Sequence, residues 1–301
     1  MKKILFPATS RVHLARQQLL LEELKKYFEV DVFIPKTKNE GGMSVYSILL
    51  AIEFSNFLVD KKYDAVLIRG DRFELLGVAM VSSYRSIPII HIEGGDLSGV
   101  IDNRIRFAIT HLSEYHFCTN QESHARLIHA GIPIGKVWNF GSLDVEFAGK
   151  VKPKKIKDKP YIFVAYHPIR GENSKELDEA LKFFSEYEII GIRSNKDYGQ
   201  TYGTESYGPE DYINLMRGAK VCVGNSSSFL KEASILKVGV VNIGSRQEKR
   251  LKPFNVLDVP CLKERIQRAI EYQIKNKYEK DLTYYQPNTS KKIAKKLKEI
   301  I

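Results

Sequence analysis

Short apolar runs alternate with longer segments of helical periodicity through the first half of the chain. A short apolar run bounded by turn residues is typical of a strand that is buried on both faces of a sheet. Strands that alternate with helices predict a parallel sheet with right-handed crossovers, so we expect a doubly wound α/β domain here. The predicted strands are residues 4–7, 30–34, 64–68, 87–92, 115–119 and 137–140.

A second series of strands and helices follows a break at residues 150–160. This segment (KVKPKKIKDKP) is rich in Lys and Pro, and its apolar residues follow neither helical nor strand periodicity. Such a segment is typical of a linker. The strands of the second series are predicted at residues 161–166, 188–192, 220–223 and 239–243, and its helices at residues 175–187, 209–217 and 228–236.

The 301 residues match two domains of roughly 150 residues each. We therefore predict two Rossmann-like doubly wound domains, at residues 1–148 and 149–285. A C-terminal helix is predicted within residues 286–301, because Ile293, Leu297 and Ile300 share one helix face.

The net charge of +11 raises the question of a nucleic-acid partner. Lysines gather at residues 150–159, 275–280 and 291–298, but they lack the interleaved aromatic residues of a base-stacking surface. We interpret these lysines as solvated faces and expect no nucleic-acid partner. A positive field also favours a small anionic substrate that bears phosphate.

Several other classes of protein are disfavoured by missing patterns. The chain has no signal-peptide pattern and no uninterrupted apolar segment of about 18 residues, so we expect a cytoplasmic protein without a membrane partner. Cys118, Cys222 and Cys261 are far apart, which predicts neither a disulfide framework nor a metal site. GxGxxG after the first strand, GxxxxGK[ST] and HExxH are also missing, which argues against dinucleotide oxidoreduction, P-loop hydrolysis and zinc peptidase chemistry.

Acidic residues follow two successive predicted strands of the first domain. Asp71 comes after the third strand, Glu93 directly after the fourth, and Asp102 in the loop beyond it. Ligands of open α/β sheets bind at the carboxyl ends of the strands, so these carboxylates are candidates for acid–base catalysis. Alternatively, Asp71 and Asp102 cap the helices that follow them. Capping explains neither Glu93 nor the paired Gly94–Gly95, and we favour a functional role for the set.

A serine cluster at residues 224–228 (GNSSS) follows a strand of the second domain and opens a helix. Backbone amides and hydroxyls at a helix N-terminus point at an anion, which makes the cluster a candidate phosphate site. The alternative is an ordinary serine N-cap. His167 follows another strand of this domain, where it is either a turn residue beside Pro168 or a group near the ligand.

Four segments resemble one enzyme family. They are RGDRFE (69–74), HIEGGDLSGVIDNRIRFAITHLSEYHF (91–117), GNSSSFLKEA (224–233) and NIGSRQEKR (242–250). In this order they resemble the UDP-N-acetylglucosamine 2-epimerase family, most of all its hydrolysing branch, which makes free N-acetylmannosamine for sialic acid synthesis, or the related bacillosamine and legionaminic acid enzymes. The resemblance implies a glycosyltransferase B-type fold, in which two Rossmann-like domains face a cleft and the last helix crosses back to the first domain.

The resemblance also implies a reaction and its residues. Hydrolysing enzymes of the family eliminate UDP from UDP-N-acetylglucosamine, form 2-acetamidoglucal and add water with inversion at C2. Asp71, Glu93 and Asp102 match the acidic positions of the family, and His167 matches a histidine near the leaving phosphate, so these are the expected catalytic residues. The expected substrate-binding residues are Arg11, Arg69, Arg72, Asn195, Ser226, Ser227, Ser228, Glu232 and Arg246. The family further implies a nucleotide-sugar ligand, no metal, no cofactor and a homodimer.

Alternatives to the hydrolysing reaction stay open at this point. One is a non-hydrolysing 2-epimerase or a relative that acts on a modified sugar nucleotide such as UDP-diacetylbacillosamine. Another is a B-type glycosyltransferase, and a third is a nucleotide-sugar binding protein without catalysis. Three carboxylates do not help to bind an anionic substrate, which argues against the third.

Overall fold

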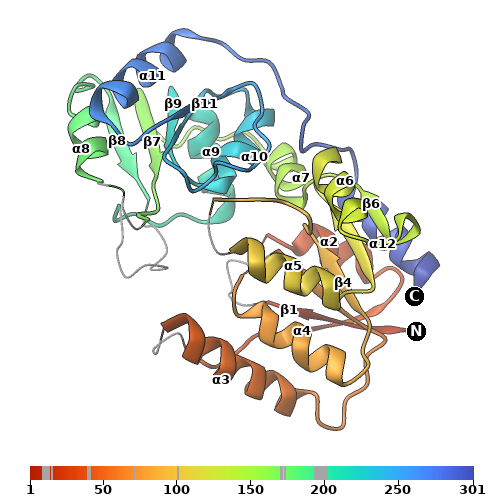
Figure 1. Cartoon of the computed structure of the whole chain (residues 1–301). Helices are drawn as coiled ribbons and strands as arrows, with labels where there is room; N and C mark the ends of the chain where they lie inside the picture. Colours follow the sequence, from red (N-terminus) through yellow and green to blue (C-terminus); the bar gives the residue numbers. More distant parts are fainter. Residues whose placement is uncertain are drawn as a thin grey trace. The chain divides into compact units, whose positions relative to one another are not determined.

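The computed structural model (Figure 1) describes residues 1–8, 14, 16–38, 42–70, 72–99, 102–169, 172, 174–192 and 203–301. The chain forms two compact units. Unit 1 comprises Met1–Leu97, Ile101–Glu146 and Gln286–Ile301, and unit 2 comprises Ser98–Val100 and Phe147–Tyr285. Within the described part of the chain, no helix is both long enough and apolar enough to cross a membrane.

Unit 1 is built on a six-stranded parallel sheet with the strand order β2-β1-β3-β4-β5-β6. Its strands are β1 (Lys3–Pro7), β2 (Glu29–Phe33), β3 (Ala65–Arg69), β4 (Ile89–Ile92), β5 (Tyr115–Cys118) and β6 (Val137–Asn139). All six predicted strands are confirmed, with ends that differ by one or two residues. Because β1 lies between β2 and β3, the direction of winding reverses there, and ligands of doubly wound folds bind at such a switch point.

The strands of unit 1 divide their side chains between two cores, one on each face of the sheet. Ile4 and Phe6 pack in the core that α2 and α12 cover, whereas Leu5 packs in the core that α3, α4 and α5 cover. Burial on both faces explains why these strands are continuous apolar runs. The helices are α2 (Gln18–Leu24), α3 (Gly42–Phe57), α4 (Leu75–Tyr84), α5 (Asp102–Leu112), α6 (Gln121–His129), the 3-10 helix η1 (Ile134–Lys136) and α12 (Thr289–Ile300). Helix α7 (Leu143–Lys150) begins in unit 1 and ends in unit 2.

The last helix is tied to α7 by a buried hydrogen-bonded pair. The Glu146 carboxylate accepts hydrogen bonds from the Ser290 amide at 2.8 Å and from its hydroxyl at 3.1 Å. Ser290 lies in the first turn of α12, so Glu146 satisfies an amide that has no partner within the helix. Helix α12 therefore forms part of unit 1.

Unit 2 repeats the same winding with five parallel strands in the order β11-β10-β9-β7-β8. Its strands are β7 (Tyr161–Ala165), β8 (Glu188–Gly191), β9 (Val221–Gly224), β10 (Val240–Ile243) and β11 (Val256–Val259), and its helices are α8 (Lys175–Leu181), α9 (Pro209–Gly218), α10 (Ser227–Leu236) and α11 (Lys263–Lys275). The first strand, β7, lies between β8 and β9, which makes its carboxyl end the switch point of unit 2.

Two details of unit 2 differ from the prediction. Helix α8 ends at Leu181 rather than at residue 187, because the Phe183 and Phe184 amides donate to carbonyls three residues back and so form tight turns. Strand β11 and helix α11 were not predicted at all.

Candidate functional site

A buried guanidinium joins two carboxylates at the carboxyl edge of the sheet in unit 1. Arg69, the last residue of β3, donates to Glu93 Oε1 at 2.8 Å and lies 2.7 Å from Asp144 Oδ2. Glu93 follows β4, and Asp144 lies in the first turn of α7. Burial lowers the pKa of Arg69, but the charges of Asp144 and Glu93 outweigh burial and raise it. Arg69 is therefore a permanent cation that fixes both carboxylates.

Glu93 has a backbone conformation that residues other than glycine rarely adopt. Its φ angle is 67°, in the left-handed region, and its amide donates to the Phe117 carbonyl at 2.8 Å. Such strain persists only where the surroundings enforce it, and it gathers at functional sites. Other described non-glycine residues share a positive φ, but Glu93 is the one among them that directly follows a strand at the carboxyl edge of its sheet.

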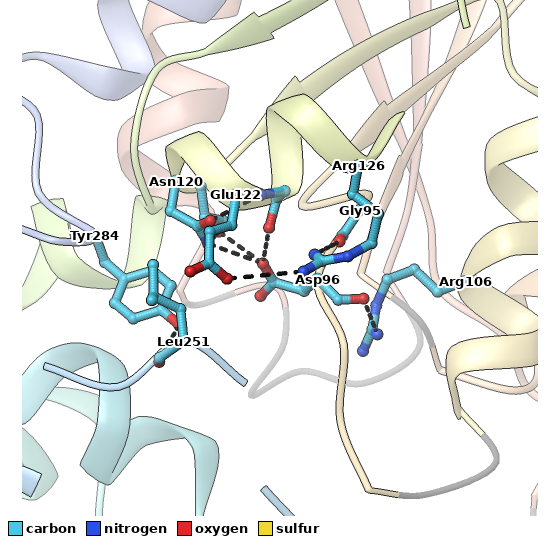
Figure 2. Close-up of polar contacts among 10 residues, drawn as sticks. Gly95, Asp96, Arg106, Asn120, Glu122, Arg126, Leu251 and Tyr284 are labelled. Carbon is cyan, nitrogen blue, oxygen red and sulfur yellow. Dashed lines mark hydrogen bonds and ion pairs between the residues drawn. The ribbon is translucent and has the colours of Figure 1, made fainter. Parts of the chain in front are cut away.

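The loop after Glu93 is anchored by Asp96, as Figure 2 shows. The buried Asp96 carboxylate accepts hydrogen bonds from Thr119 at 3.0 Å, Asn120 at 3.1 Å and Ser123 at 2.5 Å. Gly95 has a φ of 82°, and a Cβ at this position would lie 2.5 Å from the Ser123 carbonyl oxygen, so only glycine fits. These contacts fix the loop to the start of α6.

His91 in β4 supports the neighbouring strand end. Its Nε2 lies 2.9 Å from the Gly70 carbonyl, and its Nδ1 lies 3.0 Å from the Thr110 hydroxyl. Burial lowers the pKa of His91 to about 4, so the ring is neutral near pH 7. A carbonyl only accepts, so Nε2 carries the proton and Nδ1 accepts from Thr110. His91 thus holds Gly70, the residue before Asp71.

The remaining predicted residues of unit 1 are placed as follows. Asp102 is the first residue of α5 and is partly buried. Arg72 donates to the buried Glu74 at 2.5 Å and leaves 44% of its side chain exposed. Arg11 and Asp71 lie outside the described residues. The structure therefore brings Arg69 and Glu93 together, while a contact between Arg69 and substrate stays a prediction.

In unit 2, Asn225 links the carboxyl ends of three strands. Its side chain accepts from the His167 amide at 2.7 Å and donates to the His167 carbonyl at 2.9 Å. Arg246 and Gln247, in the loop after β10, each donate to the Asn225 carbonyl at 3.0 Å. Asn225 is completely buried. His167 and Arg246 are thereby gathered at the switch point of this sheet.

His167 is a neutral polar group in this arrangement. Burial and the positive charge of Arg246 lower the pKa of His167 to about 3. Its Nδ1 is buried and has no hydrogen-bond partner among the residues that the structure describes. The ring can therefore donate or accept one hydrogen bond near pH 7, but it does not carry a charge.

The serine cluster forms the N-terminus of α10. Ser226 is the N-cap and makes no side-chain capping bond within the described chain. Its hydroxyl lies 2.9 Å from that of Ser228, which also hydrogen-bonds to the Tyr212 hydroxyl. Ser226 and Ser228 are buried, whereas Ser227 is partly exposed. Ser227 and the first amides of α10 are therefore the groups of this cluster that face a ligand most readily.

Two residues of the candidate site, Asp144 and Asn225, were missed from the sequence. Asp144 follows β6 at the same edge of the sheet as Glu93. An acidic residue after a predicted strand was therefore the signal that could have identified it. Asn225 lies inside the serine cluster, but only the serines of this cluster were predicted to bind the ligand. Glu232 lies further along α10 and is 1% exposed, and Asn195 lies outside the described residues. No cluster of three or more His, Cys, Asp or Glu side chains suited to a metal ion occurs in the described part of the chain.

Two doubly wound parallel sheets, each with polar groups gathered at the carboxyl ends of its strands, define a protein of the glycosyltransferase B-type fold class. The model of one sequence family, UDP-N-acetylglucosamine 2-epimerase, matches residues 12–298. The chain belongs to this family, which confirms the resemblance seen in its motifs.

Individual relatives and structures agree with this assignment. The chain is 32% identical to the polysialic acid biosynthesis protein P7 of Escherichia coli, over 83% of this chain and 72% of that protein. It is also 32% identical to the GDP/UDP-N,N'-diacetylbacillosamine 2-epimerase (hydrolyzing) of Campylobacter jejuni, over 80% of this chain and 72% of that enzyme.

Solved structures share the fold at low sequence identity. The structure of S. aureus MnaA with UDP has a TM-score of 0.84 at 15% identity, and covers 100% of this chain and 97% of that one. The UDP-GlcNAc 2-epimerase of Methanocaldococcus jannaschii, in complex with UDP-GlcNAc and UDP, has a TM-score of 0.82 at 17% identity, over 99% of this chain and 100% of that one. The fold class predicted from the sequence is confirmed.

Proposed function

We propose that the protein is a hydrolysing UDP-N-acetylglucosamine 2-epimerase, which converts UDP-N-acetylglucosamine and water into N-acetylmannosamine and UDP. Membership of the family supports epimerase chemistry, and relatives that are named as hydrolysing support the use of water. The observation that carries the proposal is the Glu93 carboxylate, which accepts a hydrogen bond from the buried Arg69 at the carboxyl edge of the sheet of unit 1, beside the Arg69–Asp144 ion pair.

The reaction has two stages with opposite proton demands. The first breaks the C2–H and C1–O bonds of the sugar, releases UDP and leaves 2-acetamidoglucal. The second adds hydroxide at C1 and a proton at C2, on the face that inverts this carbon. The C2 proton is weakly acidic, so the first stage needs a base and the second needs an acid. We assign these roles to the set Asp71, Glu93 and Asp102, because neighbouring carboxylates adopt different protonation states.

We assign the binding of UDP to unit 2. The N-terminus of α10 offers amides and the Ser227 hydroxyl to the diphosphate, with Ser226 and Ser228 supporting the turn. Arg246 supplies positive charge, and the neutral His167 beside it can donate a hydrogen bond to the leaving phosphate. Glu232 is assigned to the ribose hydroxyls. Arg11, Arg72 and Asn195 complete the predicted substrate-binding set.

A modified sugar nucleotide is the second candidate substrate. The Campylobacter jejuni relative and a Legionella pneumophila relative, 30% identical over 68% of this chain, are both named as N,N'-diacetylbacillosamine 2-epimerases. The proposal also includes the cytoplasmic location and the homodimer expected above.

Proton NMR of the protein with UDP-N-acetylglucosamine in deuterated water tests the proposal. Free N-acetylmannosamine that carries deuterium at C2, together with UDP, is the expected result. An intact UDP-N-acetylmannosamine would instead show a non-hydrolysing epimerase. Turnover of UDP-diacetylbacillosamine alone would establish the second candidate, and no reaction with either sugar nucleotide would contradict an epimerase.

A further inference from the structure

Asp144 shares one guanidinium nitrogen with Glu93. The Nη2 atom of Arg69 lies 2.8 Å from Glu93 Oε1 and 2.7 Å from Asp144 Oδ2. The two carboxylates therefore face each other across a single nitrogen atom. Asp144 has no role in the reaction proposed above, yet its position acts directly on the charge that Glu93 meets.

The cluster of Arg69, Glu93 and Asp144 has one positive and two negative charges when both carboxyl groups are ionised. A carboxylate that has a buried guanidinium to itself is held as the anion, because an opposite charge at this distance lowers its pKa, typically by about one to three units. Such an anion is a poor proton acceptor. A second carboxylate on the same guanidinium gives the cluster one excess negative charge, so the uptake of a single proton leaves it neutral.

The surroundings of Asp144 direct this proton to Glu93. Asp144 lies between two guanidinium groups, because Arg16 Nη1 is 3.8 Å from its other oxygen, Oδ1. Two cations favour the ionised form of Asp144 more than one cation does. Without any other charges, an aspartic acid is also the stronger acid of the two, by about 0.4 pKa units. Asp144 is therefore the carboxylate that stays ionised.

The other groups that face Glu93 from β4 and from the turn before α7 are uncharged. His91, two residues before Glu93, is neutral near pH 7, because burial lowers the pKa of His91 to about 4. Ser142, directly before α7, donates a long hydrogen bond of 3.4 Å to Glu93 Oε1. The charge that Glu93 meets from β3, β4 and α7 is thus set by Arg69 and Asp144.

We infer that Asp144 is a positioning residue for the proposed epimerase reaction, and that by sharing Arg69 it keeps Glu93 able to exchange a proton with the sugar. The inference rests on the function proposed above, because it takes Glu93 to be a proton-transfer group. Asp144 itself touches no reacting atom. It acts through Arg69, which binds the Glu93 carboxylate and whose positive charge Asp144 offsets.

Asp144→Asn tests the inference, because the amide keeps the shape of the side chain and loses its charge. Arg69 then serves Glu93 alone, so the pKa of Glu93 should fall by about one unit. Carbon-13 NMR of the protein labelled at the glutamate carboxyl carbon measures this pKa without substrate, and the Glu93 signal is identified by its absence in Glu93→Gln. The matched control is Glu114→Gln, which removes one negative charge from an exposed side chain that pairs with Lys136 and should leave the pKa of Glu93 unchanged.

Arg16→Gln should shift the pKa of Glu93 in the opposite direction. Without Arg16, Asp144 draws more strongly on Arg69, so the pKa of Glu93 should rise. This variant keeps the shared guanidinium, and it tests the inference even if Asp144→Asn does not fold. An unchanged pKa of Glu93 in Asp144→Asn, or a lower one in Arg16→Gln, would overturn the inference.

The pH dependence of turnover gives a readout that a merely structural role would not change. In Asp144→Asn, the limb of the kcat profile that Glu93 causes should move to lower pH, whether Glu93 acts as a base or as an acid. Near neutral pH, kcat should fall by about threefold or more with the Kd for UDP unchanged, since a carboxylate with a lower pKa is a weaker base and is less often protonated.

The two measurements separate this inference from the function on which it rests. Absence of turnover in the wild type would contradict the proposed function, and the inference with it. An active wild type whose pH profile and Glu93 pKa are the same in Asp144→Asn would overturn the inference alone.

Discussion

The Arg69 guanidinium lies 2.8 Å from a Glu93 carboxylate oxygen, and the Arg69 side chain is only 5% exposed. The same nitrogen lies 2.7 Å from Asp144. One cation thus pairs with two carboxylates, whose side chains are 11% and 16% exposed. Removing one member of a buried ionic cluster leaves the others without compensation, so the three residues depend on one another.

Replacing Arg69 with Met should strongly destabilise unit 1. Glu93 would lose this cation while Asp144 would keep the more distant Arg16 at 3.8 Å, and breaking a buried pair in this way costs about 3–5 kcal/mol. Urea unfolding measures this loss. Arg104→Met is the control, because Arg104 is exposed on α5 and its loss should cost less than about 1 kcal/mol. Equal losses in the two variants would contradict the role of Arg69.

Asp96→Ala should slow turnover although Asp96 is not assigned to contact substrate. The change leaves the Thr119, Asn120 and Ser123 donors without their carboxylate acceptor and frees the loop that sets the conformation of Glu93. We expect kcat to fall at least tenfold, with the Kd for UDP unchanged. Glu114→Ala is the control, since the Glu114 side chain is 49% exposed and pairs with Lys136, away from this loop. A higher Kd for UDP with unchanged kcat would exclude this positioning role.

Ser227→Ala should weaken UDP binding with little effect on the chemistry. Loss of one hydrogen bond to the diphosphate corresponds to about 1 kcal/mol, or a roughly fivefold increase in Kd. Isothermal titration calorimetry with UDP measures the change, and Ser185→Ala, an exposed serine of unit 2, is the control. Unchanged affinity would remove Ser227 from the proposed phosphate site.

The stability of the fold should decrease in acid because buried histidines stay neutral. Burial lowers the pKa of His91 to about 4 and that of His116 to about 3, while the unfolded chain binds these protons near pH 6.5. The two neutral histidines therefore contribute fully to the free energy of unfolding above pH 6.5. This contribution is lost as the pH falls towards 3, because the unfolded chain then binds more protons than the folded chain.

His116→Phe tests this dependence. Between pH 6 and pH 4 the variant should lose less unfolding free energy than the wild type, by about 1.4 kcal/mol per pH unit. Urea unfolding at several pH values gives the slope. The same slope in both proteins would show that His116 is protonated in the folded state.

The strands of the fold could be predicted because burial on both faces makes each a continuous apolar run. Strand β11 was missed because it lies at the edge of its sheet, is only partly buried and stands between Pro253 and Pro260. Helix α11 was missed although Ile266, Ala269 and Ile270 are buried at helical spacing, because Lys, Arg and Glu fill most of its other positions.

The candidate site was predictable only where its residues follow strands directly. Glu93 and the serine cluster met this condition. Asp144 became part of the site through a buried ion pair with Arg69, a partner 75 positions away, and sequence spacing does not reveal such a pairing. The Asn225 contacts with His167 and Arg246 likewise depend on the order of strands in the sheet.

Kinetics and UDP binding of Glu93→Gln test the central claim most directly. The amide keeps the shape of the carboxylate but cannot exchange a proton with the sugar in the same way. If Glu93 takes part in the chemistry, release of UDP from UDP-N-acetylglucosamine should fall about 10³-fold, while the Kd for UDP stays within about twofold of the wild type. Turnover near the wild-type rate, with the fold intact, would contradict the account.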